Sequence, residues 1–130
     1  MSVHKSLPHD SAPLHVAGAA RYVDDIPLPA GSLHLAFGLS PSARGTITAL
    51  DLSAVTAATG VVAVLTADDL PFVNDVSPSA HDEPLLATGE VHHVGQPIFL
   101  VIADSHLNAR RAAKKAKVTV AEEKPVLSYE

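Results

Sequence analysis

A run of five apolar residues, from Ile98 to Ile102, constrains the fold of this 130-residue chain more than any other feature. The run contains no polar residue, whereas a strand with one solvated face alternates apolar and polar side chains. It therefore predicts a central strand that other parts of the chain cover on both faces.

The flanking segments carry the patterns of further strands and short helices. Larger apolar residues alternate with smaller or polar ones through residues 33–40, which predicts a strand with one face in the core. Ser105 is a favourable N-cap for a helix whose alanines recur at i, i+3, i+4 and i+7, namely Ala109, Ala112, Ala113 and Ala116. The other predicted elements are strands over 19–26, 46–52 and 61–65, a helix over 53–59, a helical turn over 67–70, a short strand within 85–94 and a strand from 118. The pattern predicts an α/β (α+β) domain with a mixed sheet and two or three short helices.

Two segments lack such periodicity. Residues 1–14 contain two prolines and predict an extended N-terminal arm, followed by a domain over residues 15–130. Residues 71–84 contain three prolines and predict a loop, long enough that a functional role or mobility is expected.

The composition excludes several kinds of site. The chain has no cysteine, which removes disulfides, thiolate metal sites, iron–sulfur ligation and cysteine nucleophiles. The net charge of −5 argues against nucleic-acid binding. A basic cluster over residues 110–117 is expected to be a solvated helix face, with contact to an acidic partner as the alternative. The first residues lack the apolar stretch of a signal peptide, and no run approaches the roughly 20 apolar residues of a membrane span. We therefore expect a cytoplasmic protein without a signal peptide or membrane contact.

The polar residues form no recognisable catalytic group. His92 and His93 are adjacent and would point to opposite faces of a strand, and no His pair has helical metal-binding spacing, so no metal site is predicted. Of the four acidic doublets, Asp82-Glu83 is the strongest candidate for acid–base chemistry because it lies in the predicted loop. Motifs for a serine nucleophile, a P-loop or a dinucleotide are absent. We therefore expect any chemistry to be completed by residues outside the chain, with no catalytic residue within it.

Three segments, in the order of a known family, resemble the α/β-hammerhead domain that opens the molybdenum-binding part of xanthine dehydrogenases and aldehyde oxidases. They are 18–27 (GAARYVDDIP), 60–71 (GVVAVLTADDLP) and 82–98, which includes DEPLLATGEV and VGQPI. The resemblance runs from about residue 7 to 128 and is nearest to the large subunit of bacterial xanthine dehydrogenases. The chain departs from the family pattern at residues 40–47, which lack a usual His, at Phe72 in place of a common Gly, and at Val120 in place of Tyr.

The resemblance implies a molybdenum hydroxylase that oxidises a purine or an aldehyde and passes electrons through iron–sulfur clusters and FAD to NAD or another acceptor. It places the molybdenum–molybdopterin, the clusters and FAD outside this chain. The expected partners are the remaining molybdenum-binding domain and the iron–sulfur/FAD subunit. The segment matching residues 84–87 approaches the funnel that leads to molybdenum in the family. This implies that Leu85 and Leu86 line the substrate channel, with ordinary core leucines as the alternative.

The resemblance thus favours a structural and docking domain that is not catalytic alone. A free-standing module that binds a small molecule or a protein is the alternative. A nucleic-acid adaptor using the basic face over residues 110–117 is the least favoured, because of the acidic net charge.

Overall fold

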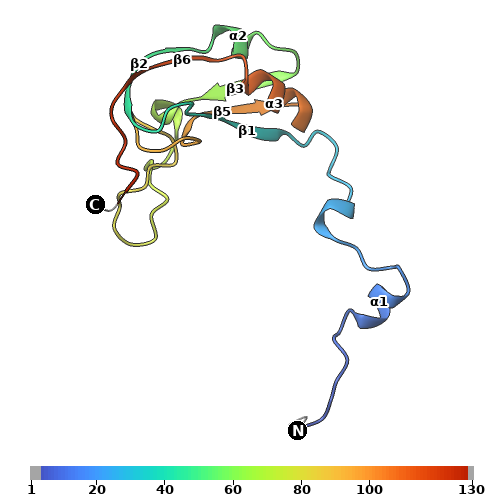
Figure 1. Ribbon diagram of the computed structural model, residues 1–130. Coiled ribbons are helices and arrows are strands. Elements are labelled where there is room, and N and C mark those ends of the chain that lie inside the picture. Colours follow the sequence, from blue (N-terminus) through green and yellow to red (C-terminus); the bar gives the residue numbers. More distant parts are fainter. Residues whose placement is uncertain (1–3, 129–130) are drawn as a thin grey trace. The chain divides into compact units, whose positions relative to one another are not determined.

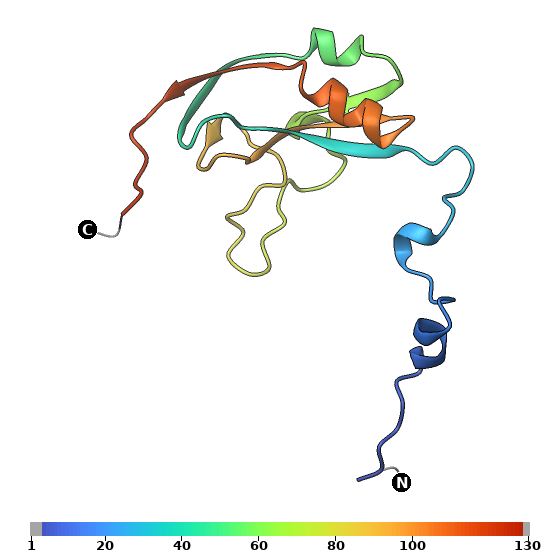
Figure 2. The ribbon, with the colours of Figure 1, turned by 45° about the vertical axis from the view of Figure 1, so that its right-hand side comes forward.

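The computed structural model describes residues 4–128, and the chain divides into two units, one up to Ala30 and one from Gly31 (Figures 1 and 2). The first unit contains the helix α1 (Ala12–Val16) and the 3₁₀ helix η1 (Val23–Asp25), and neither buries a residue. The second unit contains all of the described strands. The domain boundary predicted between residues 14 and 15 stays a prediction.

Two expectations for the first unit are wrong. The arm expected to be extended to residue 14 becomes helical at Ala12, because Pro13 lies in the first turn of α1, where its fixed φ favours a helix. Residues 1–3 of that arm lie outside the described residues. The strand predicted over 19–26 is replaced by η1, whose Asp25 carboxylate accepts the Tyr22 backbone N–H at 2.9 Å. A local cap therefore outcompetes strand pairing here.

The second unit is built from two three-stranded antiparallel sheets. The first sheet has the strand order β1–β5–β3 and the second β4–β2–β6. The strands are β1 (His34–Leu39), β2 (Gly45–Asp51), β3 (Val61–Leu65), β4 (Glu90–Val91), β5 (Pro97–Ala103) and β6 (Lys117–Glu122). The helices are α2 (Ser53–Thr56), the 3₁₀ helix η2 (Ala67–Asp69) and α3 (His106–Ala113).

The α/β class and the short helices are confirmed, but the predicted mixed sheet is corrected to two antiparallel sheets. A parallel pair would need a crossover that returns to the same sheet. The connection through α3 instead leaves β5 in the first sheet and enters β6 in the second. The chain between β3 and β5, residues 66–96, brings β5 back antiparallel to β3.

The core lies around β5, as its apolar run predicts. Ile98, Phe99, Leu100 and Val101 are buried in succession, and β5 is the central strand of the first sheet. The core cluster joins both sheets and two helices through Val55, Ala87, Val91, Ile98, Phe99, Val101 and Ala112. Figures 1 and 2 show α2 and α3 over the same side of the first sheet.

The start of α3 agrees with its sequence pattern. The Ser105 hydroxyl caps the helix by accepting the Asn108 backbone N–H at 3.3 Å. Ala109 and Ala112 are almost fully buried, so the alanine stripe lets α3 lie close to the sheet.

Candidate functional site

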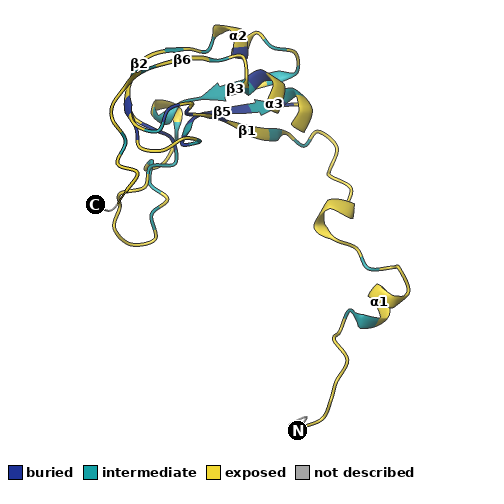
Figure 3. Ribbon diagram, viewed as in Figure 1, coloured by how far each residue is buried: buried dark blue, intermediate teal, exposed yellow. Residues whose placement is uncertain are grey.

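Strand β1 exposes its large side chains and buries its small ones. Leu35, Phe37 and Leu39 are 55%, 44% and 52% exposed, whereas Gly38 is buried. Figure 3 shows that much of β1 is exposed, beside the more buried β5. The period of two predicted for this strand is confirmed, but the larger apolar residues lie on the solvent side. This arrangement reverses the usual preference for large apolar side chains inside.

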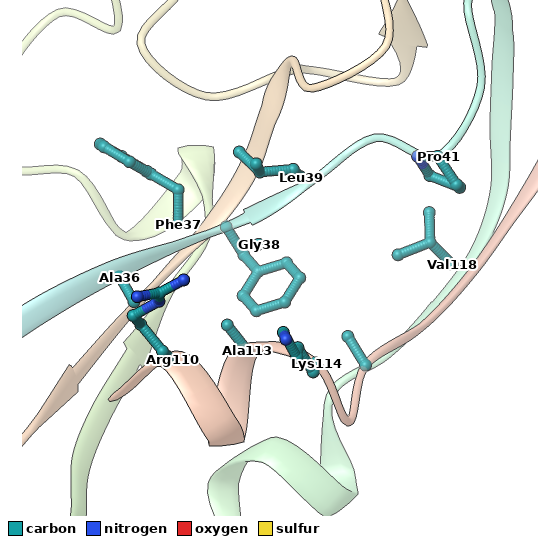
Figure 4. Close-up of a pocket in the computed structure, with 11 residues that line it drawn as sticks. Ala36, Phe37, Gly38, Leu39, Pro41, Arg110, Ala113, Lys114 and Val118 are labelled. Atoms are coloured by element: carbon teal, nitrogen blue, oxygen red, sulfur yellow. The ribbon is translucent and has the colours of Figure 1, made fainter. Parts of the chain in front are cut away.

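The close approach of Phe99 to Gly38 explains the reversal. Gly38 and Phe99 are register partners across β1 and β5, and a Cβ added at Gly38 would lie 2.0 Å from the Phe99 ring. Figure 4 shows Phe37 and Leu39 projecting from β1 on the side away from Ala113 of α3. A slip of one residue would place a large side chain against Phe99, so the Gly38–Phe99 contact selects the observed register.

The exposed side chains of β1 belong to a continuous apolar sheet face. Leu35 aligns with Ile102, and Phe37 aligns with Leu100, and directly paired residues of antiparallel strands point to the same face. The same register reaches β3 through Ala63 and Leu65. We name this surface the outer face, and it comprises Leu35, Phe37, Leu39, Ala63, Leu65, Leu100 and Ile102. It contains no charged side chain, and its most exposed part is β1.

The segment over residues 84–87 is fixed by Asn74 in the preceding loop. The Asn74 amide donates to the Leu86 carbonyl oxygen at 2.7 Å and its oxygen accepts the Leu86 N–H at 2.9 Å. One side chain therefore satisfies both backbone groups of Leu86, as a neighbouring strand would. Leu86 is 0% exposed, whereas Leu85 is only half-buried. Leu86 is therefore buried in this domain, and the place of Leu85 and Leu86 in a substrate channel stays a prediction.

We expect Asn74→Ala to lower the free energy of unfolding by about 1–3 kcal/mol, because it leaves the buried Leu86 N–H and carbonyl without partners. Urea unfolding measures this change, and amide hydrogen exchange at Leu86 should accelerate. Asn74→Asp is the matched control, since a carboxylate keeps the acceptor for the N–H but loses the donor to the carbonyl. Slow exchange at Leu86 in Asn74→Ala would show that the clamp is dispensable.

The polar residues considered from the sequence do not converge. Within residues 4–128, no group of three or more His, Cys, Asp or Glu side chains could hold a metal. Asp82 of the favoured doublet accepts a hydrogen bond from the Ser77 hydroxyl at 3.4 Å, within the same loop. His81 pairs with Asp75 in the same loop. His92 Nε2 lies 4.0 Å from Oε2 of Glu90, which is two residues earlier in the chain.

The Asp68-Asp69 doublet has a structural role. The Asp69 carboxylate accepts the Thr66 backbone N–H at 2.7 Å and the Thr66 hydroxyl at 2.8 Å, and caps η2. These two hydrogen bonds stabilise the charged carboxylate and hold the pKa of Asp69 below its ordinary value of 3.8. A lowered pKa keeps the carboxylate ionised, so Asp69 is unsuited to act as a general acid near neutral pH.

Sequence reasoning missed the outer face and the Asn74 clamp. A signal for the outer face was present in β1, because the residues that alternate with its large side chains include Ala36 and Gly38, which fit close to a helix and an aromatic ring. The clamp had no comparable signal, since Asn74 and Leu86 are brought together only by the path of the loop. Among residues 4–128, no helix is both long and apolar enough to cross a membrane.

Comparison with known proteins relates this fold to one family of oxidoreductases. Residues 17–124 match the family model described as "Aldehyde oxidase and xanthine dehydrogenase, a/b hammerhead domain". The chain is 42% identical to xanthine dehydrogenase 1 of Arabidopsis thaliana over 127 residues, covering 98% of this chain and 9% of that protein. An aldehyde oxidoreductase from Desulfovibrio desulfuricans aligns with a TM-score of 0.83 and 29% identity, over 95% of this chain and 15% of that chain.

A solved Cu,Mo-CO dehydrogenase chain is similar too, with a TM-score of 0.80 and 32% identity over 94% of this chain and 16% of that chain. The matched part is therefore a small fraction of each relative's length. The family match over most of the chain, the high identity and the shared fold agree. The chain belongs to the aldehyde oxidase and xanthine dehydrogenase family, as its α/β-hammerhead domain.

Proposed function

We propose that this chain is the structural and docking domain of a larger molybdenum hydroxylase of the xanthine dehydrogenase type. In this proposal, the outer face packs against the remaining molybdenum-binding domain of the enzyme. The enzyme hydroxylates a purine or an aldehyde and passes electrons to NAD or another acceptor. The chain itself carries no step of that reaction.

The observation that carries this proposal is the exposure of the large apolar side chains of β1. Contiguous apolar patches on a folded domain mark interaction surfaces, and here the large side chains are held outward by the Gly38–Phe99 contact. The relatives are also much longer than this chain, which spans 9% of xanthine dehydrogenase 1. If a larger polypeptide covers this surface, both the exposed apolar side chains and the greater length of the relatives are explained.

The side chains of this domain do not suit the cofactors of such an enzyme. The chain has no cysteine for iron–sulfur clusters, and its described residues offer no group of side chains that could hold a metal. In the proposal, the molybdenum–molybdopterin is therefore bound by the remaining molybdenum-binding domain. The iron–sulfur clusters and FAD are bound by the iron–sulfur/FAD subunit, which is the second proposed partner.

We keep Leu85 and Leu86 as proposed residues of the substrate route, and their burial gives them different parts in it. Leu85 is half-buried and retains surface that a flat apolar substrate would contact. Leu86 is fully buried, so its part is to anchor the segment through the Asn74 clamp.

The proposal is tested by assaying the purified 130-residue chain with xanthine, with an aromatic aldehyde and with an electron-accepting dye. We expect no substrate-dependent reduction of the dye and no bound molybdenum by elemental analysis. The larger enzyme that contains the domain, assayed in parallel, should reduce the dye. Turnover by the chain alone would contradict the proposal. A gene that encodes no molybdenum-binding sequence after Glu130 would instead favour a free-standing binding module.

A further inference from the structure

A groove of about 440 Å³ lies between β1 and α3, and Phe37 and Leu39 of the outer face border it along β1. Ala36 and Gly38 line it on the strand side, with the Phe99 ring beneath Gly38. Arg110 and Lys114 line it on the helix side (Figure 4). The groove is therefore apolar at its base and cationic along one wall.

The strand that borders this groove has a free edge. Among residues 4–128, β1 is the outermost strand of the first sheet and pairs with β5 alone. Alternate backbone N–H and C=O groups of such an edge strand point away from the sheet and are available to another extended chain. The edge and the groove lie together, so a strand added to β1 would place every second side chain on the side of α3.

The two basic side chains of the groove have no acidic partner in the described part of the chain. The ion pairs among residues 4–128 involve Arg44, His81 and His92, but neither Arg110 nor Lys114. Both groove residues are exposed. Their charge stands out in a chain whose net charge is −5.

The spacing of the two cations matches that of a strand. Residues four apart on a helix have Cβ atoms about 5–6 Å apart, and alternate residues of a strand are about 6.4–6.8 Å apart. Two acidic residues at positions i and i+2 of an added strand could therefore each meet one cation. The residues between them would point to the other side of the sheet, where they would extend the apolar outer face.

We propose that the β1 edge and the groove beside α3 bind an extended acidic peptide segment as an added antiparallel strand. The segment alternates acidic residues, which face Arg110 and Lys114, with apolar residues, which continue the outer face. Backbone pairing with β1 supplies affinity, and the cations select the acidic sequence. The site adjoins the outer face along β1, but it is defined by the strand edge and by the two cations of α3.

The test uses the full 130-residue chain and a capped, fluorescently labelled hexapeptide of alternating valine and aspartate. Fluorescence anisotropy measures binding, and NMR shifts of the amides of β1 locate it. A peptide of alternating valine and lysine tests charge selection. The valine–aspartate peptide with N-methylated valines tests backbone pairing, because it lacks those N–H donors.

The chain provides a matched pair of variants on the same helix. Arg110→Glu with Lys114→Glu reverses the two charges of the groove. Arg111→Glu with Lys115→Glu makes the same change at the same spacing, at two residues that line a hollow with Ala58 and Thr59 and do not line the groove. Circular dichroism checks that each variant is folded, and Arg110→Gln with Lys114→Gln replaces the first pair if charge reversal unfolds it.

We expect the groove pair to weaken binding on the order of tenfold or more, and the control pair to change it much less. The N-methylated and the lysine peptides should bind far more weakly than the valine–aspartate peptide. Equal weakening by the two charge pairs, undiminished binding of the N-methylated peptide, or no binding at all would overturn the proposal. Oligodeoxythymidine should displace the labelled peptide less well than the same concentration of unlabelled valine–aspartate peptide. Equal displacement by the two competitors would also overturn the proposal, because it would indicate a surface that binds any anion.

Discussion

Gly38→Ala is expected to lower the free energy of unfolding of the domain by about 2–3 kcal/mol, which is a large effect for one added methyl group. The cause is steric, because the new Cβ would lie 2.0 Å from ring atoms of Phe99. Phe99 is 1% exposed and lies in the core cluster, so moving its ring disturbs the packing around it. Urea unfolding with linear extrapolation measures the change.

A double-mutant cycle with Phe99→Leu isolates this contact. The atoms that would meet the new Cβ are Cε1, Cζ and Cε2 of the ring, and leucine has none of them. Phe99→Leu should be destabilising by itself because it leaves a cavity. Gly38→Ala should then cost clearly less in the Phe99→Leu background than in the native one. Equal costs in both backgrounds would mean that the ring does not set the requirement for glycine.

Leu35→Lys combined with Phe37→Lys is expected to weaken assembly with the rest of the enzyme while leaving the domain folded. Both side chains project from the outer face and are about half exposed, so the isolated domain should lose about 1 kcal/mol of stability or less. Each substitution should weaken the binding free energy between the domain and the rest of the enzyme by about 2 kcal/mol or more, because it removes an apolar anchor and places a charge in the interface. Co-expression of the domain and the remaining polypeptide as two chains, followed by co-purification, measures the loss of assembly.

Thr119→Lys with Ala121→Lys is the matched control for this pair. These positions are also exposed and two residues apart on one strand, but they lie on β6 in the second sheet. We expect this variant to co-purify with the remaining polypeptide nearly as well as the native domain. A similar loss for both variants would indicate that added positive charge, and not the outer face, controls assembly.

The sequence predicted correctly the elements that a long apolar run or a local helix cap determines. The run at 98–102 became the buried central strand β5, and Ser105 caps α3 as expected. The predicted strand over 19–26 failed because the side chain of Asp25 closes a local turn, and no neighbouring strand competes with it. The predicted mixed sheet failed because sequence patterns locate strands but do not indicate in which sheet each strand pairs.

The functional surfaces depended on tertiary contacts that a linear pattern does not contain. The alternation in β1 indicated a two-faced strand, but the choice of buried face follows from the Phe99 ring beneath Gly38. Leu85 and Leu86 were singled out together, yet the Asn74 clamp buries one of them and leaves the other partly exposed. The basic side chains over residues 110–117 are exposed, as expected for a solvated face, but the sequence did not indicate that Arg110 and Lys114 line a groove beside β1.

Hydroxyl-radical footprinting would show whether the rest of a larger enzyme covers the outer face. Oxidation rates of Phe37, Leu35 and Leu39 would be compared by mass spectrometry between the purified domain and the larger enzyme. Phe99 is buried in the domain alone and serves as an internal reference. We expect the three side chains to be oxidised rapidly in the isolated domain and to be strongly protected in the enzyme. Equal oxidation of Phe37 in the two samples would contradict it.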